Sequence, residues 1–198
     1  IARLGHRVGW FGRLGQDRVG RMIVKRIRGE GVDVSRVQLT AEANTGLMLR
    51  ETVSGRTSVY YYRRFSAAST MRPEHLDEDY IRQARILHVT GITPALSDSC
   101  RETVFAAMRI ARRHGVKICF DPNLRLKLWG LDEARKVLLP MAEEADYFLP
   151  GLDELKLLYE TENFDDIVER LSRLSAVSVV KGGGQETYLV EAGRVVSV

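Results

Sequence analysis

The chain has 198 residues, of which 44% are hydrophobic and 28% charged, and its net charge at pH 7 is +4. This length suits one α/β domain with a core of its own, or one domain with a small appendage. No run of eighteen apolar residues is present, which excludes a membrane-spanning helix. The arginines lie beside Glu and Asp rather than in a basic block with interleaved aromatics, which disfavours nucleic-acid binding.

The first α/β unit occupies residues 1–31. Arg7–Phe11 reads as a strand, and a glycine-rich turn follows it with Gly12 and Gly15. The segment Gln16–Gly29 places its apolar residues at helical spacing and ends on glycine, which predicts a helix.

Residues 32–66 lack helical periodicity and form a β-only insert. Two strand-like runs, Thr45–Val53 and Thr57–Phe65, are joined by Ser-Gly-Arg, which predicts a hairpin. Because the insert separates α/β units, we expect it to stand off the main sheet.

One run inside the insert, "YYYRRFSAAS" from Tyr60 to Ser69, has two interpretations. It is typical of an edge strand with a solvated face, and also of a strand whose arginine reaches an acidic ligand. Alternation along a strand places Tyr61 and Arg63 on one face, and Arg64 with the neighbouring tyrosines on the other.

Residues 67–198 return to strand–helix alternation, which predicts a mainly parallel, doubly wound sheet with ligands at the carboxyl ends of the strands. We expect Ser97 to cap one helix and Pro140 to kink or break another. The predicted strands are 85–91, 116–121, 145–150, 176–183 and 186–198, the last a hairpin about Ala192–Gly193, and the predicted helices are 97–114, 132–144, 152–160 and 164–174.

Three polar segments follow buried strands. In "FDPNLRLKLW" (120–129), Asp121 and Asn123 could hold phosphate oxygens or water around a metal, and Arg125 could clamp a carboxylate. The alternative is a helix-capping turn with a solvated arginine.

In "VVKGGGQE" (179–186), Lys181 and the glycines suit a nucleotide, although the run is no Walker A loop and equally fits a tight turn. In "VTGITPALS" (89–97), Ile92 could face a ligand or belong to a simple connection.

Other enzyme signatures are missing from the chain. No G-x-S-x-G, H-E-x-x-H or metal-spaced Cys/His set occurs, so hydrolase and zinc-enzyme interpretations have no support. Cys100 and Cys119 form no CxxC pair, and we interpret both as reduced core residues of a cytoplasmic protein.

The chain resembles the ribokinase-like (PfkB) sugar kinases, and most closely the 2-keto-3-deoxygluconate kinases. Residues 4–20, "LGHRVGWFGRLGQDRVG", look like the end of that family's first signature, and residues 32–66 look like its β lid. The segments "YYYRRFSAAS", "HVTGITPALS" and "FDPNLRLKLW" are similar to three segments of the deoxygluconate kinases, while "DPNLR" is shared with fructokinases.

The resemblance implies phosphorylation of the 6-hydroxyl of 2-keto-3-deoxygluconate, with ATP and Mg²⁺ as cofactors. The residues that match the family's substrate contacts are Tyr61, Arg63, Ile92 and Arg125. Those on the nucleotide side are Asn123, Lys181 and Gly183. Glu154 matches the glutamate of the N-x-x-E motif, which helps to hold Mg²⁺ through water, although Gly151 stands where that motif has a polar residue.

Both ends of the chain read as cut, so we expect a fragment of a longer protein. The family's Gly-Ala-Gly-Asp signature, with its catalytic Asp, would follow Val198, and its amino-terminal sugar-binding residues would precede Ile1. We therefore expect these 198 residues alone not to phosphorylate sugar. The alternatives are fructokinase or another ribokinase-like kinase, and a non-catalytic sugar- or nucleotide-binding protein on the same scaffold. The resemblance also implies pairing of two copies through the lid, with Tyr60 and Tyr62 as contacts.

Overall fold

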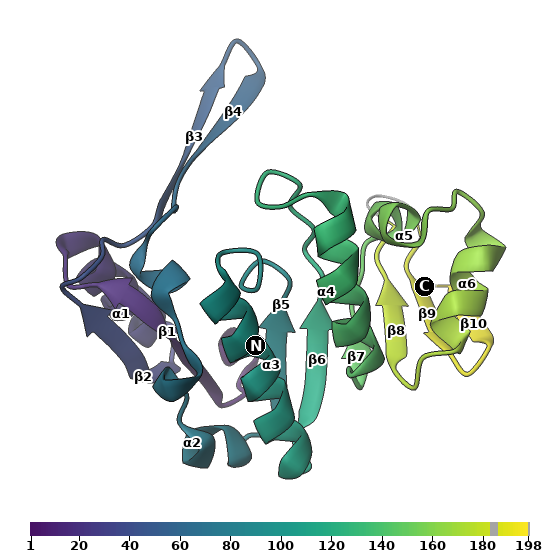
Figure 1. The fold of residues 1–198 in the computed structure, drawn as a ribbon, viewed down its shortest axis with the longest axis horizontal. Coiled ribbons are helices and arrows are strands. Elements are labelled where there is room, and N and C mark those ends of the chain that lie inside the picture. Colours follow the sequence, from purple (N-terminus) through teal and green to yellow (C-terminus); the bar gives the residue numbers. More distant parts are fainter. Residues whose placement is uncertain (183–185, 198) are drawn as a thin grey trace. The chain divides into compact units, whose positions relative to one another are not determined.

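The computed structural model describes residues 1–182 and 186–197 (Figure 1). They divide into two compact units, Ile1–His75 and Leu76–Val198. Among the described residues, no helix is long and apolar enough to cross a membrane.

The first unit is built on a strand–helix–strand motif. Strand β1 (Val8–Gly15) pairs in parallel with β2 (Val32–Thr40), and α1 (Arg18–Gly29) connects them. Gly12 pairs with Val37 and Gly15 with Thr40, so the glycines predicted to form a turn extend the strand instead. The difference arises because β2, a partner distant in sequence, supplies the hydrogen bonds that keep this glycine-rich segment extended.

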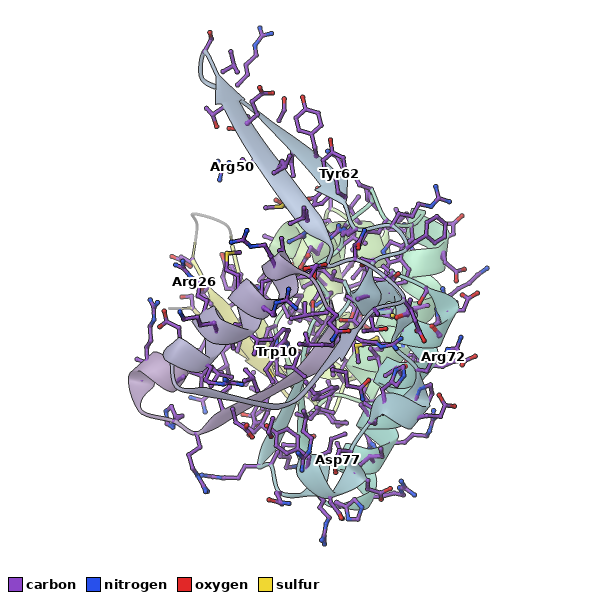
Figure 2. The ribbon with its side chains drawn as sticks, turned by 90° about the vertical axis from the view of Figure 1, so that its left-hand side faces the viewer. Trp10, Arg26, Arg50, Tyr62, Arg72 and Asp77 are labelled. Carbon is purple, nitrogen blue, oxygen red and sulfur yellow. The ribbon has the colours of Figure 1, made fainter. Side chains whose placement is uncertain are left out.

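The strands β3 (Leu47–Val53) and β4 (Arg56–Tyr62) form a separate antiparallel hairpin in the first unit (Figure 1). Ser54 and Gly55 connect them with φ values of 49° and 78°, as a two-residue hairpin turn requires. Residues 47–62 are exposed except for Val59, which is half-buried; Figure 2 labels Arg50 and Tyr62 on this hairpin. The predicted hairpin is therefore confirmed, whereas β2, in the residue range assigned to the insert, pairs with β1.

The second unit is a six-stranded sheet with the order β10-β9-β8-β7-β6-β5. The four strands β5 to β8 are parallel, and β9 and β10 are antiparallel, which confirms the predicted mainly parallel α/β sheet. The strands are β5 (Ile86–Thr90), β6 (Lys117–Asp121), β7 (Tyr147–Phe148), β8 (Val177–Val180), β9 (Tyr188–Glu191) and β10 (Arg194–Ser197). The helices are α2 (Glu78–Arg82), α3 (Asp98–Arg113), α4 (Leu131–Glu143), α5 (Leu152–Tyr159) and α6 (Phe164–Ser172).

The core of the second unit centres on β6 and β7. Phe120 and Phe148 are almost fully buried and stack with ring centroids 5.6 Å apart. Alternation along β6 buries Ile118 and Phe120 and leaves Asp121 only partly covered at the strand end. Burial of the apolar side chains thus fixes the strand that presents Asp121.

Pro140 does not break α4, which continues through it to Glu143. Proline removes the hydrogen bond to the carbonyl four residues earlier, here that of Lys136. Both residues are exposed and Pro140 lies in the last turn, so water can solvate the freed carbonyl at little cost.

A carboxylate joins α1 to the start of the hairpin. The Asp17 carboxylate accepts hydrogen bonds from the backbone N–H groups of Gly20 and Thr45, both at 2.7 Å, and from the Thr45 hydroxyl at 3.0 Å. The Thr45 Oγ1 in turn accepts a bond from the Gly15 N–H at 2.9 Å. A Cβ at Gly15 would lie 2.3 Å from an Asp17 carboxylate oxygen, so this close approach requires glycine. Backbone N–H donation from Thr45 and Gly20 lowers the pKa of Asp17.

We expect Asp17→Asn to destabilise the protein in a pH-dependent way. Because the folded-state pKa of Asp17 is lowered, the stabilisation is fully present above the ordinary Asp pKa of about 3.9 and disappears as the pH falls through the lower folded-state value. Unfolding midpoints of wild type and variant, measured from neutral to acid pH, should therefore converge at low pH. Thr45→Val, which keeps the carboxylate and its two backbone bonds, should give a gap that changes less with pH. A gap for Asp17→Asn that is constant with pH would contradict this account.

Candidate active site

The carboxyl ends of the parallel strands in the second unit bring four loops to one edge of the sheet. Backbone pairing continues beyond the strands: the Gly91 N–H donates to the Asp121 carbonyl at 3.0 Å, and the Lys181 N–H donates to the Pro150 carbonyl at 2.8 Å. The Leu152 N–H then donates to the Lys181 carbonyl at 3.0 Å. Parallel strands place their carboxyl ends together, and such an edge is where open α/β sheets bind ligands.

Gly91 allows the loop after β5 to lie against the loop after β6. A Cβ at this position would lie 2.1 Å from the Pro122 carbonyl oxygen and 2.6 Å from a Leu138 methyl carbon. The next residue, Ile92, is half-buried, and its carbonyl accepts a hydrogen bond from the Ala95 N–H at 3.2 Å. The Ile92 carbonyl thus takes part in its own turn, and a wall contact of its side chain with substrate stays a prediction.

Asp121 and Lys181 form an ion pair across this edge. The Lys181 ammonium lies 2.8 Å from an Asp121 carboxylate oxygen, and the side chains are 48% and 18% exposed respectively. The same carboxylate accepts a longer bond from the Asn123 N–H at 3.3 Å. The predicted nucleotide-side lysine therefore lies beside the predicted Asp121–Arg125 segment, although sixty residues separate them in the sequence. Gly183 lies outside the described residues.

The loop after β6 holds Asn123 and Arg125 in a defined geometry. Asn123 has φ of 41°, in the left-handed region that asparagine tolerates better than most residues. The Arg125 guanidinium donates to the Asn123 side-chain oxygen and to the Leu124 carbonyl, both at 3.0 Å. A guanidinium has five N–H donors, so Arg125 retains donors for a carboxylate after these two bonds.

Glu154 lies in the first turn of α5 and bridges two loops. One carboxylate oxygen accepts from the Leu124 N–H at 2.7 Å, and the other accepts from the Gly151 N–H at 2.8 Å. Within residues 1–182 and 186–197, no three His, Cys, Asp or Glu side chains form a group that could hold a metal ion. The contact of Glu154 with Mg²⁺ through water stays a prediction.

Tyr61 and Arg63 belong to the first unit, at the end of the hairpin. The Arg63 guanidinium carbon lies 4.1 Å from the centroid of the Tyr61 ring, as expected for side chains two residues apart on one face. Arg63 Nε and Nη2 are buried and have no hydrogen-bond partner among the described residues. Arg64, by contrast, is exposed and lies over the Phe65 ring at 5.4 Å. Buried N–H groups of a cation are normally paired, so Arg63 is the better candidate to bind an anionic group.

Sequence reasoning missed three features that shape these sites. It did not identify Thr45 as the partner of Asp17, the close approach of Gly91 to Pro122, or the ion pair of Lys181 with Asp121. A signal for the ion pair did exist, because a lysine and an aspartate each follow a buried strand and parallel strands end at one edge.

Residues 1–198 match the family described as pfkB family carbohydrate kinase. The chain belongs to this family. It is 39% identical over 197 residues to a 2-dehydro-3-deoxygluconokinase of Bacillus subtilis, covering 98% of this chain and 60% of that enzyme. It is 33% identical over 168 residues to a probable fructokinase of Arabidopsis thaliana, covering 84% of this chain and 48% of the relative.

A crystal structure of a PfkB protein from Polaromonas sp. JS666 has the same fold. It superposes with a TM-score of 0.93 at 35% identity, covering all of this chain and 68% of that one. The ribokinase-like fold expected from the sequence is therefore confirmed. The chain spans about 60% of the length of the Bacillus subtilis enzyme.

We expect Gly91→Ala to destabilise the protein by about 1–3 kcal/mol, the range for inserting a methyl group into a packed site. The new methyl group cannot be accommodated unless the backbone at Pro122 moves. Gly29→Ala is the matched control, because a Cβ at Gly29 meets nothing within 4 Å and alanine favours the helix. Denaturant unfolding of both variants makes the comparison, and equal effects would show that the close approach at Gly91 is unimportant.

Proposed function

We propose that the protein is a sugar-acid kinase, which transfers the terminal phosphoryl group of ATP to the 6-hydroxyl of 2-keto-3-deoxygluconate. The observation that carries the proposal is Arg63, whose buried Nε and Nη2 have no acceptor among the residues described. A carboxylate would satisfy both with two parallel hydrogen bonds. Membership of a carbohydrate kinase family supports the reaction class, and the 39% identity to a 2-dehydro-3-deoxygluconokinase supports the choice of substrate.

The carboxylate is what distinguishes this substrate from a neutral hexose. We assign Arg63 and Arg125 to binding the acid, with Tyr61 holding the Arg63 guanidinium and Ile92 forming an apolar contact with substrate. A charge-assisted hydrogen bond contributes about 1.5–3 kcal/mol, or roughly ten- to hundredfold in affinity. A hexose that leaves the buried Arg63 donors unpaired forgoes this contribution, which gives discrimination without steric exclusion.

ATP and Mg²⁺ complete the proposal. We assign Lys181 and Gly183 to the nucleotide and Asn123 to its phosphates, and the resemblance assigns Glu154 to a water of Mg²⁺. Phosphoryl transfer depends on positioning and on compensation of phosphate charge more than on covalent catalysis by the protein. The Lys181 ammonium, half-exposed at the sheet edge, would supply positive charge of the kind this step needs when a phosphate oxygen replaces Asp121 as its partner.

Fructokinase activity is the second candidate. It is favoured by the 33% identity to a probable fructokinase, which covers 84% of this chain. A fructokinase has no substrate carboxylate to bind, so it would leave Arg63 without the partner that its buried N–H groups require. The two candidates therefore make opposite predictions for this residue.

In the full-length protein, we expect Arg63→Ala to raise the KM for 2-keto-3-deoxygluconate by about ten- to hundredfold. The ratio of kcat/KM for the acid to kcat/KM for fructose should fall by a similar factor, because only the acid loses a charge-assisted contact. Steady-state kinetics with both sugars provide the measurement. Arg64→Ala is the matched control and should leave the ratio unchanged, since Arg64 is exposed. If Arg63→Ala retains the wild-type preference for the acid, the proposed role of Arg63 is wrong.

We also propose that two copies pair through the hairpin. Its apolar side chains are exposed, among them Met48 (56%), Leu49 (55%) and Tyr62 (62%). An isolated two-stranded hairpin is at best marginally stable in water, and exposed apolar strands favour association. We expect the wild-type protein to sediment as a dimer and the Tyr62→Glu variant to shift towards monomer. Arg50→Glu, on the exposed β3 strand, is the control for the change of charge on the hairpin. A monomeric wild type would refute the pairing.

A further inference from the structure

We propose that Glu154 is a positioning residue for the loop that carries Asn123 and Arg125, so that its carboxylate sets the affinity for the acidic substrate. The identity of the substrate here rests on the proposed function, whereas the positioning role of Glu154 rests on the geometry of the second unit. It differs from the metal-holding role that the resemblance implies, which predicts an effect on Mg²⁺ dependence instead.

The Glu154 carboxylate spans two loops. It accepts from the Leu124 N–H, after β6, at 2.7 Å and from the Gly151 N–H, before α5, at 2.8 Å. Gly151 is the N-cap residue of α5, and Glu154 at the N3 position accepts from the Gly151 N–H, which is the glutamate half of a capping box. Leu124 is buried, so its N–H needs a protein acceptor.

The peptide groups of Leu124 connect Glu154 to Arg125. The Leu124 N–H is held by Glu154, and the Leu124 carbonyl accepts from the Arg125 guanidinium at 3.0 Å. The same guanidinium donates to the Asn123 side chain at 3.0 Å. Releasing the Leu124 N–H would therefore loosen the residue on which the orientation of Arg125 depends.

A strained backbone conformation at Asn123 lies next to this contact. Asn123 has φ of 41°, a conformation that L residues adopt only at a cost and that persists where the surroundings hold it. Its neighbours hold it from both sides: Asp121 accepts from the Asn123 N–H at 3.3 Å, and Glu154 accepts from the Leu124 N–H at 2.7 Å. The second bond is much the shorter, so Glu154 is the principal restraint on this turn.

Glu154→Gln in the full-length protein tests the proposal. Glutamine has the same shape, but its amide NH₂ would face one of the two backbone N–H donors, so one bond is lost. We expect the KM for 2-keto-3-deoxygluconate to rise by about tenfold while kcat changes by less than about threefold. The Mg²⁺ concentration that gives half-maximal rate should be unchanged. Asp153→Asn is the matched control, because it removes a carboxylate from the same helical turn at an exposed position.

Hydrogen exchange gives a readout that does not depend on activity. The Leu124 amide should exchange at least about tenfold faster in Glu154→Gln, with the amides of Ile118 and Phe120 in β6 unchanged as a measure of the intact fold. If Glu154→Gln does not fold, Glu154→Asp keeps the charge, cannot reach both amides, and should give the same pattern.

The outcomes separate the alternatives. A raised Mg²⁺ requirement with an unchanged KM for the sugar acid would overturn the proposal in favour of the metal role. Unchanged exchange at Leu124 would overturn the anchoring itself. A wild-type protein that phosphorylates no sugar acid would defeat the proposed function and the effect on substrate affinity, whereas faster exchange at Leu124 in the variant would still support the anchoring.

Discussion

Hydrogen bonding at the carboxyl ends of the parallel strands is the constraint on which the candidate site depends. Each strand that ends there leaves backbone groups that the following loop must satisfy. The Gly91 N–H donates to the Asp121 carbonyl, and the Lys181 N–H donates to the Pro150 carbonyl. The loops therefore continue the hydrogen bonding of the sheet just beyond the ends of the strands. These backbone bonds consequently place the loops that carry the polar side chains.

Carboxylates complete this bonding where backbone partners run out. Asp17 accepts from the amides of Gly20 and Thr45, and Glu154 accepts from those of Leu124 and Gly151. In each case one carboxylate accepts from donors in two chain segments, and charged acceptors form stronger hydrogen bonds than neutral ones. In both cases an acidic residue at the start of a helix therefore fixes the position of a neighbouring chain segment.

Local signals in the sequence predicted the elements that depend on local interactions. Ser97 caps α3, its hydroxyl accepting from the Cys100 N–H at 3.1 Å, and the turn at Ala192 and Gly193 has the positive φ values of a tight hairpin. Interactions distant in sequence were the ones missed. The pairing of β1 with β2 extends a strand through glycines that were predicted to form a turn, and β7, expected over residues 145–150, is in register with β6 and β8 at Tyr147 and Phe148.

The same division holds for the candidate site. The sequence shows that polar residues follow buried strands, and this pattern identified Asn123, Arg125 and Lys181. The partners of those residues could not be read, because Glu154 lies thirty positions from Leu124 and nothing in the spacing joins them. A motif predicts which side chains reach an edge, whereas hydrogen-bond partners depend on the register of neighbouring loops.

The two arginines assigned to the substrate differ in what binding would change. Arg125 already donates to Asn123 and Leu124, so its guanidinium is fixed before a ligand arrives and loses little freedom on binding. Arg63 has two buried N–H groups without an acceptor, so a carboxylate there also relieves an existing desolvation cost. On the proposed assignment, the larger gain in affinity should therefore come from Arg63 and a smaller one from Arg125. Loosening the Arg125 loop and removing the Arg63 side chain should therefore lower the affinity for the sugar acid by different factors.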